Sequence, residues 1–190
     1  WITNRIIIVS KELKNMEILT LEDIKKAKER ISGYIRRTPL WEEGRLEEFV
    51  GCKLYLKPEN LQLTGAFKIR GALNTALSLS KDELEKGIIT SSSGNHAQAC
   101  AYVGRMLGIH ATVVIPEDAP KVKINNAKRM GAEVILWDRS YAKRWEKVYE
   151  EEKLHGYIPI HPYEEPRVMA GQGTIGLEIL EDCPEVKTVV

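Results

Sequence analysis

Hydrophobic and polar residues follow two different rhythms along this chain. Ile24, Ala27 and Ile31 recur at helical spacing, and Thr20 with Asp23 three residues later resembles a capping box. This pattern predicts a helix over 21–32. Similar spacing or length predicts further helices over 66–79, 95–107, 120–130, 140–154 and 167–181. Short apolar runs bounded by Gly or Pro predict strands at 53–57, 87–91, 111–115, 133–137, 157–160 and 186–190.

The order of these elements predicts the fold class. From residue 87 onward strands alternate with helices that are long enough to cross a sheet. Such an order is typical of parallel βαβ units with right-handed crossovers. We therefore expect an α/β protein with a parallel sheet, and 190 residues suffice for one domain or two small lobes.

Composition and charge exclude several classes of protein. Hydrophobic residues make up 43% and charged residues 29%, which are globular values, and a net charge of +1 gives no electrostatic basis for nucleic-acid binding. No apolar run approaches the roughly 20 residues of a membrane span. Cys52, Cys100 and Cys183 are far apart and lack CxxC spacing, so we expect no disulfide framework, no metal site and a reducing cytoplasm.

The segment Ser91-Ser-Ser-Gly-Asn-His96 lies where a strand should end and a helix begin. The carboxyl end of a parallel strand is where α/β proteins bind ligands, and a helix start offers free N–H groups to an anion. The residues predict a carboxylate or phosphate site. The alternative is that the serines only cap the helix and that His96 is an ordinary surface residue.

Lys68 follows Gly65-Ala-Phe at the expected start of another helix. Partial burial and the positive end of the helix dipole would both disfavour its charge, which leaves the neutral amine that attacks carbonyl groups. The alternative is an ordinary solvated lysine.

Three other patterns are expected to carry no chemistry. The letters G-x-G-x-x-G occur at 171–176, but no strand leads directly into Gly171, so we expect no dinucleotide site. His96 and Cys100 lie four residues apart without a third partner, which argues against a nucleophile pair. Tyr141, Trp145 and Tyr149 form a stripe at helical spacing that favours core packing.

Five blocks in order and spacing resemble one enzyme family. They are Asn60-Leu-Gln-Leu-Thr-Gly-Ala-Phe-Lys-Ile-Arg-Gly-Ala72, Ser92-Ser-Gly-Asn-His-Ala-Gln98, the run 114–123 with Gly131-Ala-Glu-Val134, His161-Pro-Tyr163 and Ala170-Gly-Gln-Gly-Thr174. The chain resembles the threonine dehydratase (threonine ammonia-lyase) and serine racemase family from about residue 17 onward. These are pyridoxal 5'-phosphate (PLP) enzymes of fold type II, so the resemblance implies that fold, that cofactor and an amino-acid substrate.

The resemblance also implies roles for particular residues. Lys68 corresponds to the lysine that forms the internal Schiff base and then removes the Cα proton, Phe67 packs beside the cofactor ring, and Asn95 binds the ring's 3′-oxygen. The loop that receives the substrate carboxylate comprises Ser92, Gly94, Asn95 and His96. The implied reaction eliminates water from threonine or serine and yields a 2-oxoacid and ammonia.

Two departures from the family pattern leave alternatives open. Ala66 stands where many relatives have serine, so any hydrogen bond from that position is lost. Ser93 occupies the position where serine racemases place an acid/base serine on the ring face opposite the lysine. Amino-acid racemisation, with Ser93 as a second catalytic residue, is therefore an alternative to elimination.

The family layout implies a division of the chain and a concern about its length. Residues 1–16 are expected to be a tail, 17–86 the first part of a large cofactor domain, 87–160 a small domain, and 161–190 a return into the large domain. The family's glycine-rich phosphate loop would follow residue 190, so a non-catalytic fragment is a third hypothesis. The resemblance further implies a cytoplasmic homo-oligomer without nucleic-acid or membrane partners, and a place in isoleucine biosynthesis or in catabolism.

Overall fold

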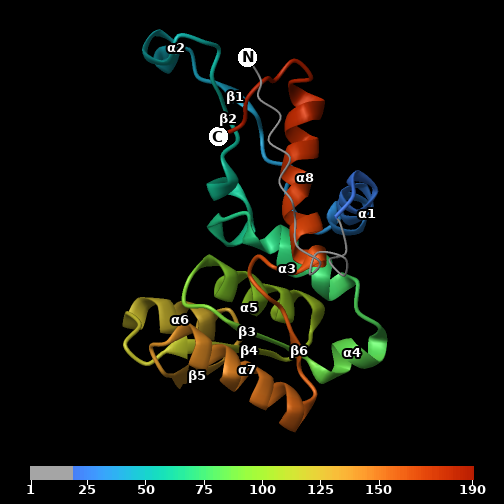
Figure 1. Cartoon of the computed structure of the whole chain (residues 1–190), viewed down its shortest axis with the longest axis vertical. Helices are drawn as coiled ribbons and strands as arrows, with labels where there is room; N and C mark the ends of the chain where they lie inside the picture. Colours follow the sequence, from blue (N-terminus) through green and yellow to red (C-terminus); the bar gives the residue numbers. More distant parts are fainter. Residues whose placement is uncertain (1–18) are drawn as a thin grey trace, which may run out of the picture.

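Four parallel strands form the main sheet of this protein, whose computed structural model describes residues 19–190 (Figure 1). The expected tail of residues 1–16 lies outside the described residues. In spatial order the strands are β5 (Glu133–Trp137), β4 (Ala111–Pro116), β3 (Ile88–Ser91) and β6 (Ile158–Pro159). Along the chain they are connected by α5 (Asn95–Leu107), α6 (Lys121–Arg129) and α7 (Tyr141–His155). The prediction of parallel βαβ units is confirmed.

Helices cover both faces of this sheet, as the alternation along β4 requires. Val113 and Ile115 pack with Ala97 of α5 and Ala127 of α6, whereas Val114 belongs to a cluster with α7 on the other face. Successive side chains of a strand point to opposite faces, so a strand buried on both sides reads as a continuous apolar run. Figure 1 shows α5 and α6 on one side of the sheet and α7 on the other.

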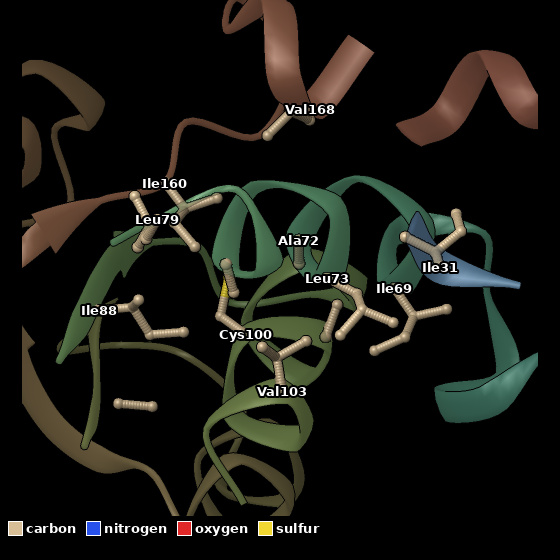
Figure 2. Packing of buried hydrophobic residues seen from close by; sticks show 13 residues of the cluster. Ile31, Ile69, Ala72, Leu73, Leu79, Ile88, Cys100, Val103, Ile160 and Val168 are labelled. Atoms are coloured by element: carbon tan, nitrogen blue, oxygen red, sulfur yellow. The ribbon is translucent and has the colours of Figure 1, made fainter. Parts of the chain in front are cut away.

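The second part of the molecule is a group of helices built around α3 (Lys68–Leu77). This helix packs between α5 on one side and α1 (Leu21–Ile31) and α8 (Pro166–Asp182) on the other. Figure 2 shows the shared apolar core, which contains Leu73 of α3, Val103 of α5, Ile88 of β3 and Ile160, the residue after β6. Because α3 is packed on several sides, its first residue, Lys68, has a fixed place relative to the sheet.

Small residues allow α3 and α8 to approach closely. Gly171, Gly173 and Gly176 lie inside α8, so no strand runs into the G-x-G-x-x-G letters, as the sequence indicated. A Cβ on Gly171 would overlap the carbonyl group of Arg70, and a Cβ on Gly173 would come within 2.9 Å of Ile24. Gly171 and Gly173 therefore serve helix packing.

The predicted helices lie within two residues of their expected bounds, but other elements differ. The predicted strand 53–57 shortens to β2 (Tyr55–Leu56), which pairs antiparallel with an unpredicted strand, β1 (Trp41–Glu42). Short helices were also missed: α2 (Gly44–Val50), α4 (Lys81–Lys86), and the 3-10 turns η2 (Glu59–Leu61) and η3 (Leu63–Gly65).

The prediction of a strand at 186–190 is wrong. These residues form no strand, and a single turn bond joins the Val186 N–H to the Cys183 carbonyl at 3.1 Å. A strand is defined by its hydrogen-bonded neighbour, and none of the described strands pairs with this segment. The apolar run alone could not supply that partner.

Among residues 19–190 no helix has both the length and the apolar character that a bilayer crossing demands.

Candidate active site

A pocket of about 350 Å³ lies at the carboxyl end of β3, between the start of α3 and the starts of α5 and α7. Its walls are formed by Lys68, Ser91, Ser92, Ser93, Asn95, His96, Tyr141, Arg144, Pro162 and Tyr163. A larger hollow of about 580 Å³ lies between α1, α3 and α8, and none of the predicted site residues lines it. The smaller pocket is therefore the candidate site.

The loop after β3 presents hydrogen-bond donors to this pocket. The Ser92 N–H donates to the Val114 carbonyl at 3.2 Å and so extends the sheet pairing by one residue. The Gly94 N–H then donates to Ser92 Oγ at 3.2 Å, and α5 begins at Asn95. Gly94 caps the helix without a side-chain hydrogen bond, so the first N–H groups of α5 have no side-chain cap. Helix starts of this kind attract carboxylates and phosphates in general, and the anion site stays a prediction here.

The lysine reaches the pocket through a tight turn and a helix start. Thr64 and Gly65 both have positive φ, 65° and 70°, and this turn delivers the chain into α3 at Lys68. Lys68 Nζ donates a hydrogen bond to the Pro162 carbonyl at 2.9 Å. Burial lowers the pKa of Lys68, which favours the neutral amine. Lys68 is partly buried, as the sequence suggested, and its chemical role stays a prediction.

A buried network of ion pairs anchors α3 two residues beyond the lysine. The Arg70 side chain is fully buried and donates to both Glu59 and Glu178, with distances between 2.7 and 3.0 Å. Lys57 Nζ also pairs with Glu178 at 2.6 Å. These bonds join the η2 turn, α3 and α8, so they fix the helix that carries Lys68.

His96 is a buried residue, and the alternative of an ordinary surface histidine is wrong. It is 3% exposed, and its Nε2 lies 3.1 Å from the Ile160 carbonyl and 3.6 Å from the Cys100 sulfur. Burial lowers the pKa of His96 to about 4, so the ring is neutral at neutral pH. Its Nδ1 has no partner among the described residues. Burial also raises the pKa of Cys100, so the thiol keeps its proton and is a poor nucleophile.

Positive charge without negative charge characterises the pocket walls. Arg144 contributes a cation, Lys68 is the second basic side chain, and no Asp or Glu belongs to the lining. Arg144 is 9% exposed; its Nη1 donates to the carbonyls of Asp138 and Arg139 at 3.0 and 2.5 Å, and its Nε donates to Ser91 Oγ at 3.3 Å. An anionic ligand would therefore meet complementary charge here.

The structure brings together most of the residues that the sequence singled out. Lys68, Ser92, Ser93, Asn95 and His96 line the one pocket, whereas Phe67 and Gly94 are adjacent in sequence but do not belong to its lining. Within residues 19–190 there is no group of three His, Cys, Asp or Glu residues that could hold a metal ion.

Sequence reasoning missed the wall that α7 contributes. The pattern placed Tyr141, Trp145 and Tyr149 in the core, but only Trp145 is buried, and Tyr141 is 44% exposed and lines the pocket. The available signal was topological, because α7 starts after β5 at the same edge of the parallel sheet where α5 starts after β3. Arg144, one turn into α7, could have been found in this way.

Known proteins resemble this chain in sequence and in structure. A family model described as pyridoxal-phosphate dependent enzyme matches residues 31–190. The L-threonine ammonia-lyase of Thermotoga maritima is 44% identical over 173 residues, which are 91% of this chain and 43% of that protein. The catabolic L-threonine dehydratase TdcB of Staphylococcus aureus USA300 is 46% identical over 181 residues, which are 94% of this chain and 52% of that protein.

The fold of this chain is also similar to that of a solved structure. The serine racemase of Dictyostelium discoideum is similar with a TM-score of 0.82 and 42% identity, covering 90% of this chain and 55% of that one. The chain thus spans about half the length of the curated relatives it matches. The expected resemblance and the expected α/β fold are both confirmed.

Proposed function

Because this chain belongs to the family of pyridoxal-phosphate dependent enzymes, we propose that it contributes the cofactor lysine and the substrate loop of a threonine or serine ammonia-lyase. The proposed reaction removes water from the amino acid and yields a 2-oxoacid and ammonia. One observation carries the proposal: Lys68 shares a pocket without acidic residues with Ser92, Ser93 and Asn95.

The residues of the pocket fit the cofactor chemically. A neutral amine is the form that condenses with an aldehyde, and burial favours that form at Lys68. Lys68 would therefore hold the cofactor, with Phe67 and Asn95 proposed beside its ring. When bound, pyridoxal phosphate supplies an electron sink that acidifies the Cα–H of an amino acid.

The chain's own residues would then bind the substrate and move its protons. Ser92, Gly94, Asn95 and His96 would receive the α-carboxylate through their hydroxyl, amide and backbone donors at the start of α5. The neutral His96 ring has one proton, on the Nε2 that donates to the Ile160 carbonyl, so the share of His96 would be its backbone N–H. Lys68 Nζ, once free, would accept the Cα proton as a general base.

Loss of the lysine tests this assignment directly. We expect the visible absorbance of a lysine-bound cofactor in the protein and its loss in Lys68→Ala. Lys81→Ala is the matched control, because the Lys81 side chain is 86% exposed and lies outside the pocket. If Lys68→Ala keeps the same visible absorbance band as the wild type, Lys68 is excluded as the cofactor lysine.

The presence of Ser93 in the pocket wall favours a second candidate function, amino-acid racemisation. Ser93 and Lys68 come from different elements, so they could serve opposite faces of Cα. We expect Ser93→Ala to abolish racemisation and to spare elimination if this division of roles holds. Equal loss of both activities would contradict it.

A third hypothesis is that the 190-residue chain is a non-catalytic fragment that binds the cofactor weakly. Equilibrium dialysis with pyridoxal phosphate separates the two cases: stoichiometric binding in the micromolar range would exclude this hypothesis. The fully buried Arg70 network supports binding, since it holds the start of α3 independently of any ligand.

The proposal extends to the setting in which the protein works. Three cysteines that form no disulfide suit a reducing cytoplasm. We also propose a homo-oligomer and either isoleucine biosynthesis or catabolism as the metabolic role; the Staphylococcus aureus relative is named a catabolic enzyme. We further propose the boundaries 17–86, 87–160 and 161–190 as the division of the chain into domain segments.

A further inference from the structure

The amine of Lys68 rests on one backbone carbonyl. Lys68 Nζ donates to the Pro162 oxygen at 2.9 Å, and it lies 4.9 Å from the centroid of the Phe67 ring and 5.3 Å from that of Tyr163. A lysine amine is drawn to a carbonyl oxygen as a donor and, when protonated, to the faces of aromatic rings. Pro162 is itself a buried residue. Its carbonyl therefore fixes the place of the amine before any ligand arrives.

A second donor reaches the same carbonyl from α8. Gln172 Nε2 lies 3.4 Å from the Pro162 oxygen, so the two lone pairs of this oxygen serve a lysine of α3 and a glutamine of α8. A distance of 3.4 Å is long for an N–H···O hydrogen bond, which usually measures about 2.7–3.2 Å. Lys68 thus makes the stronger of the two bonds and Gln172 the weaker.

The surface of α3 holds the Gln172 amide in place. A Cβ on Gly71 would come within 3.1 Å of Gln172 Nε2 and 2.8 Å of Val168 Cγ1, so the absence of a side chain at Gly71 gives the amide its room. Gly71 is three residues beyond Lys68, and residues at this spacing share a helix face. The amide therefore lies about one helical turn from the lysine, with its N–H group directed to Pro162.

Reaction of Lys68 with an aldehyde would take the nearer donor away from this carbonyl. The neutral amine attacks the aldehyde carbon, a carbon–nitrogen double bond forms, and the aldehyde oxygen leaves as water with both amine hydrogens. The nitrogen then carries at most one proton, where the ammonium group carried three. Leaving a buried acceptor without a donor costs free energy, and Gln172 is the side-chain donor that remains at the Pro162 oxygen.

We propose that Gln172 is a positioning residue that shares the Pro162 carbonyl with the free Lys68 and becomes its side-chain donor when Lys68 is bound to the cofactor. This inference rests on the proposed function, in which Lys68 is the cofactor lysine. Gln172 does not belong to the pocket lining, so it acts through Pro162 and not on the cofactor itself. Without this glutamine, cofactor binding would remove the last side-chain donor from the carbonyl, and the lysine would be released less readily.

Two substitutions of Gln172 test the proposal through cofactor affinity. Gln172→Met keeps the length without a donor, whereas Gln172→Glu keeps the shape but turns an ionised acceptor toward the Pro162 oxygen. Titration with pyridoxal phosphate, followed by visible absorbance, gives each dissociation constant. The loss of one hydrogen bond, about 0.5–1.5 kcal/mol, corresponds to a factor of roughly 2 to 12 in affinity. We expect Gln172→Met to bind 2- to 12-fold more weakly than the wild type, and Gln172→Glu at least as weakly as Gln172→Met.

The order of the two variants separates positioning from packing. A residue that only packs would tolerate glutamate, the nearer match in shape, better than methionine. Gln98→Met is the matched control, because Gln98 is also a half-buried glutamine within a helix and lies outside the pocket lining; it should keep the wild-type affinity. If Gln172→Met does not fold in urea unfolding, Gln172→Glu, which must also bind more weakly than the wild type, carries the test.

Reductive trapping gives a second readout that needs neither turnover nor a phosphate site. Pyridoxal, which lacks the phosphate, is reduced onto the protein with borohydride, and the fraction trapped at Lys68, measured by mass spectrometry, should fall in both Gln172 variants. Wild-type affinity in Gln172→Met, or tighter binding by Gln172→Glu than by Gln172→Met, would overturn this proposal alone, because the wild type would still show the lysine-bound band. A wild type with no such band and no trapping at Lys68 would overturn the proposed function, and this inference with it.

Discussion

The contact between α3 and α8 gives a quantitative prediction about Gly171. In Gly171→Ala the new Cβ would overlap the Arg70 carbonyl oxygen and lie 2.8 Å from both the Arg70 carbonyl carbon and the Gly71 Cα. All three atoms belong to backbone, so no rotamer change relieves the overlap and one helix must move. Overpacking costs about 1–3 kcal/mol, and a backbone obstacle places this variant at the upper end, about 3 kcal/mol. For a protein of this size that corresponds to a Tm lower by roughly 6–12 °C.

The same helix offers a matched control. Gly176 has nothing within 4 Å of an added Cβ, so Gly176→Ala should stabilise the helix by about 0.5–1 kcal/mol because alanine loses less backbone entropy. Urea unfolding of both variants, followed by circular dichroism, measures the difference in the free energy of unfolding, expected near ~4 kcal/mol. If the two variants lie within about 1 kcal/mol of each other, the close approach of the two helices is refuted.

Two further predictions concern buried charge. Arg70→Met should destabilise the protein by about 3–5 kcal/mol in urea unfolding, because it leaves Glu59 and Glu178 without their shared partner. Adding Glu178→Gln should recover part of this loss. An Arg70→Met protein of wild-type stability would contradict the prediction. The folded pKa of His96, about 4, lies below the usual unfolded value of 6.5, so the stability that is fully present above pH 6.5 should fall by up to ~3 kcal/mol as the pH drops toward 4. His96→Gln should flatten this part of the stability profile. Proton NMR that shows the His96 ring titrating near 6.5 would disprove the assignment.

Much of the sheet region could be predicted because its signals are local. The β4 run is mostly apolar and β3 begins with two isoleucines, which suits burial on two faces. Gly108 and Gly156 end their helices with positive φ. The position of Lys68 at a helix start and of Ser92 and Asn95 after a strand followed from the same patterns. These features depend on residues that are neighbours in the sequence.

The errors have a common physical origin. The segment 186–190 has the composition of a strand but pairs with none of the described strands. Tyr141 has the spacing of a core residue but lines a pocket. A helix stripe can be buried by its neighbours or left at a site, and spacing alone does not distinguish these outcomes. Both errors concern partners that are distant in the sequence.

By itself, the sequence determined the long helices, the alternating strands and helices between residues 87 and 160, the lysine and serine segments that mark the enzyme family, and the general location of a site at the end of β3. Only the tertiary structure decided that His96 is buried against Ile160, that the His161 ring lies 3.3 Å from the Tyr141 hydroxyl, and that Arg70 joins two glutamates from separate segments. The reason is that backbone periodicity and helix starts arise from adjacent residues, whereas burial, tautomers and ion pairs depend on which distant side chains the fold brings together.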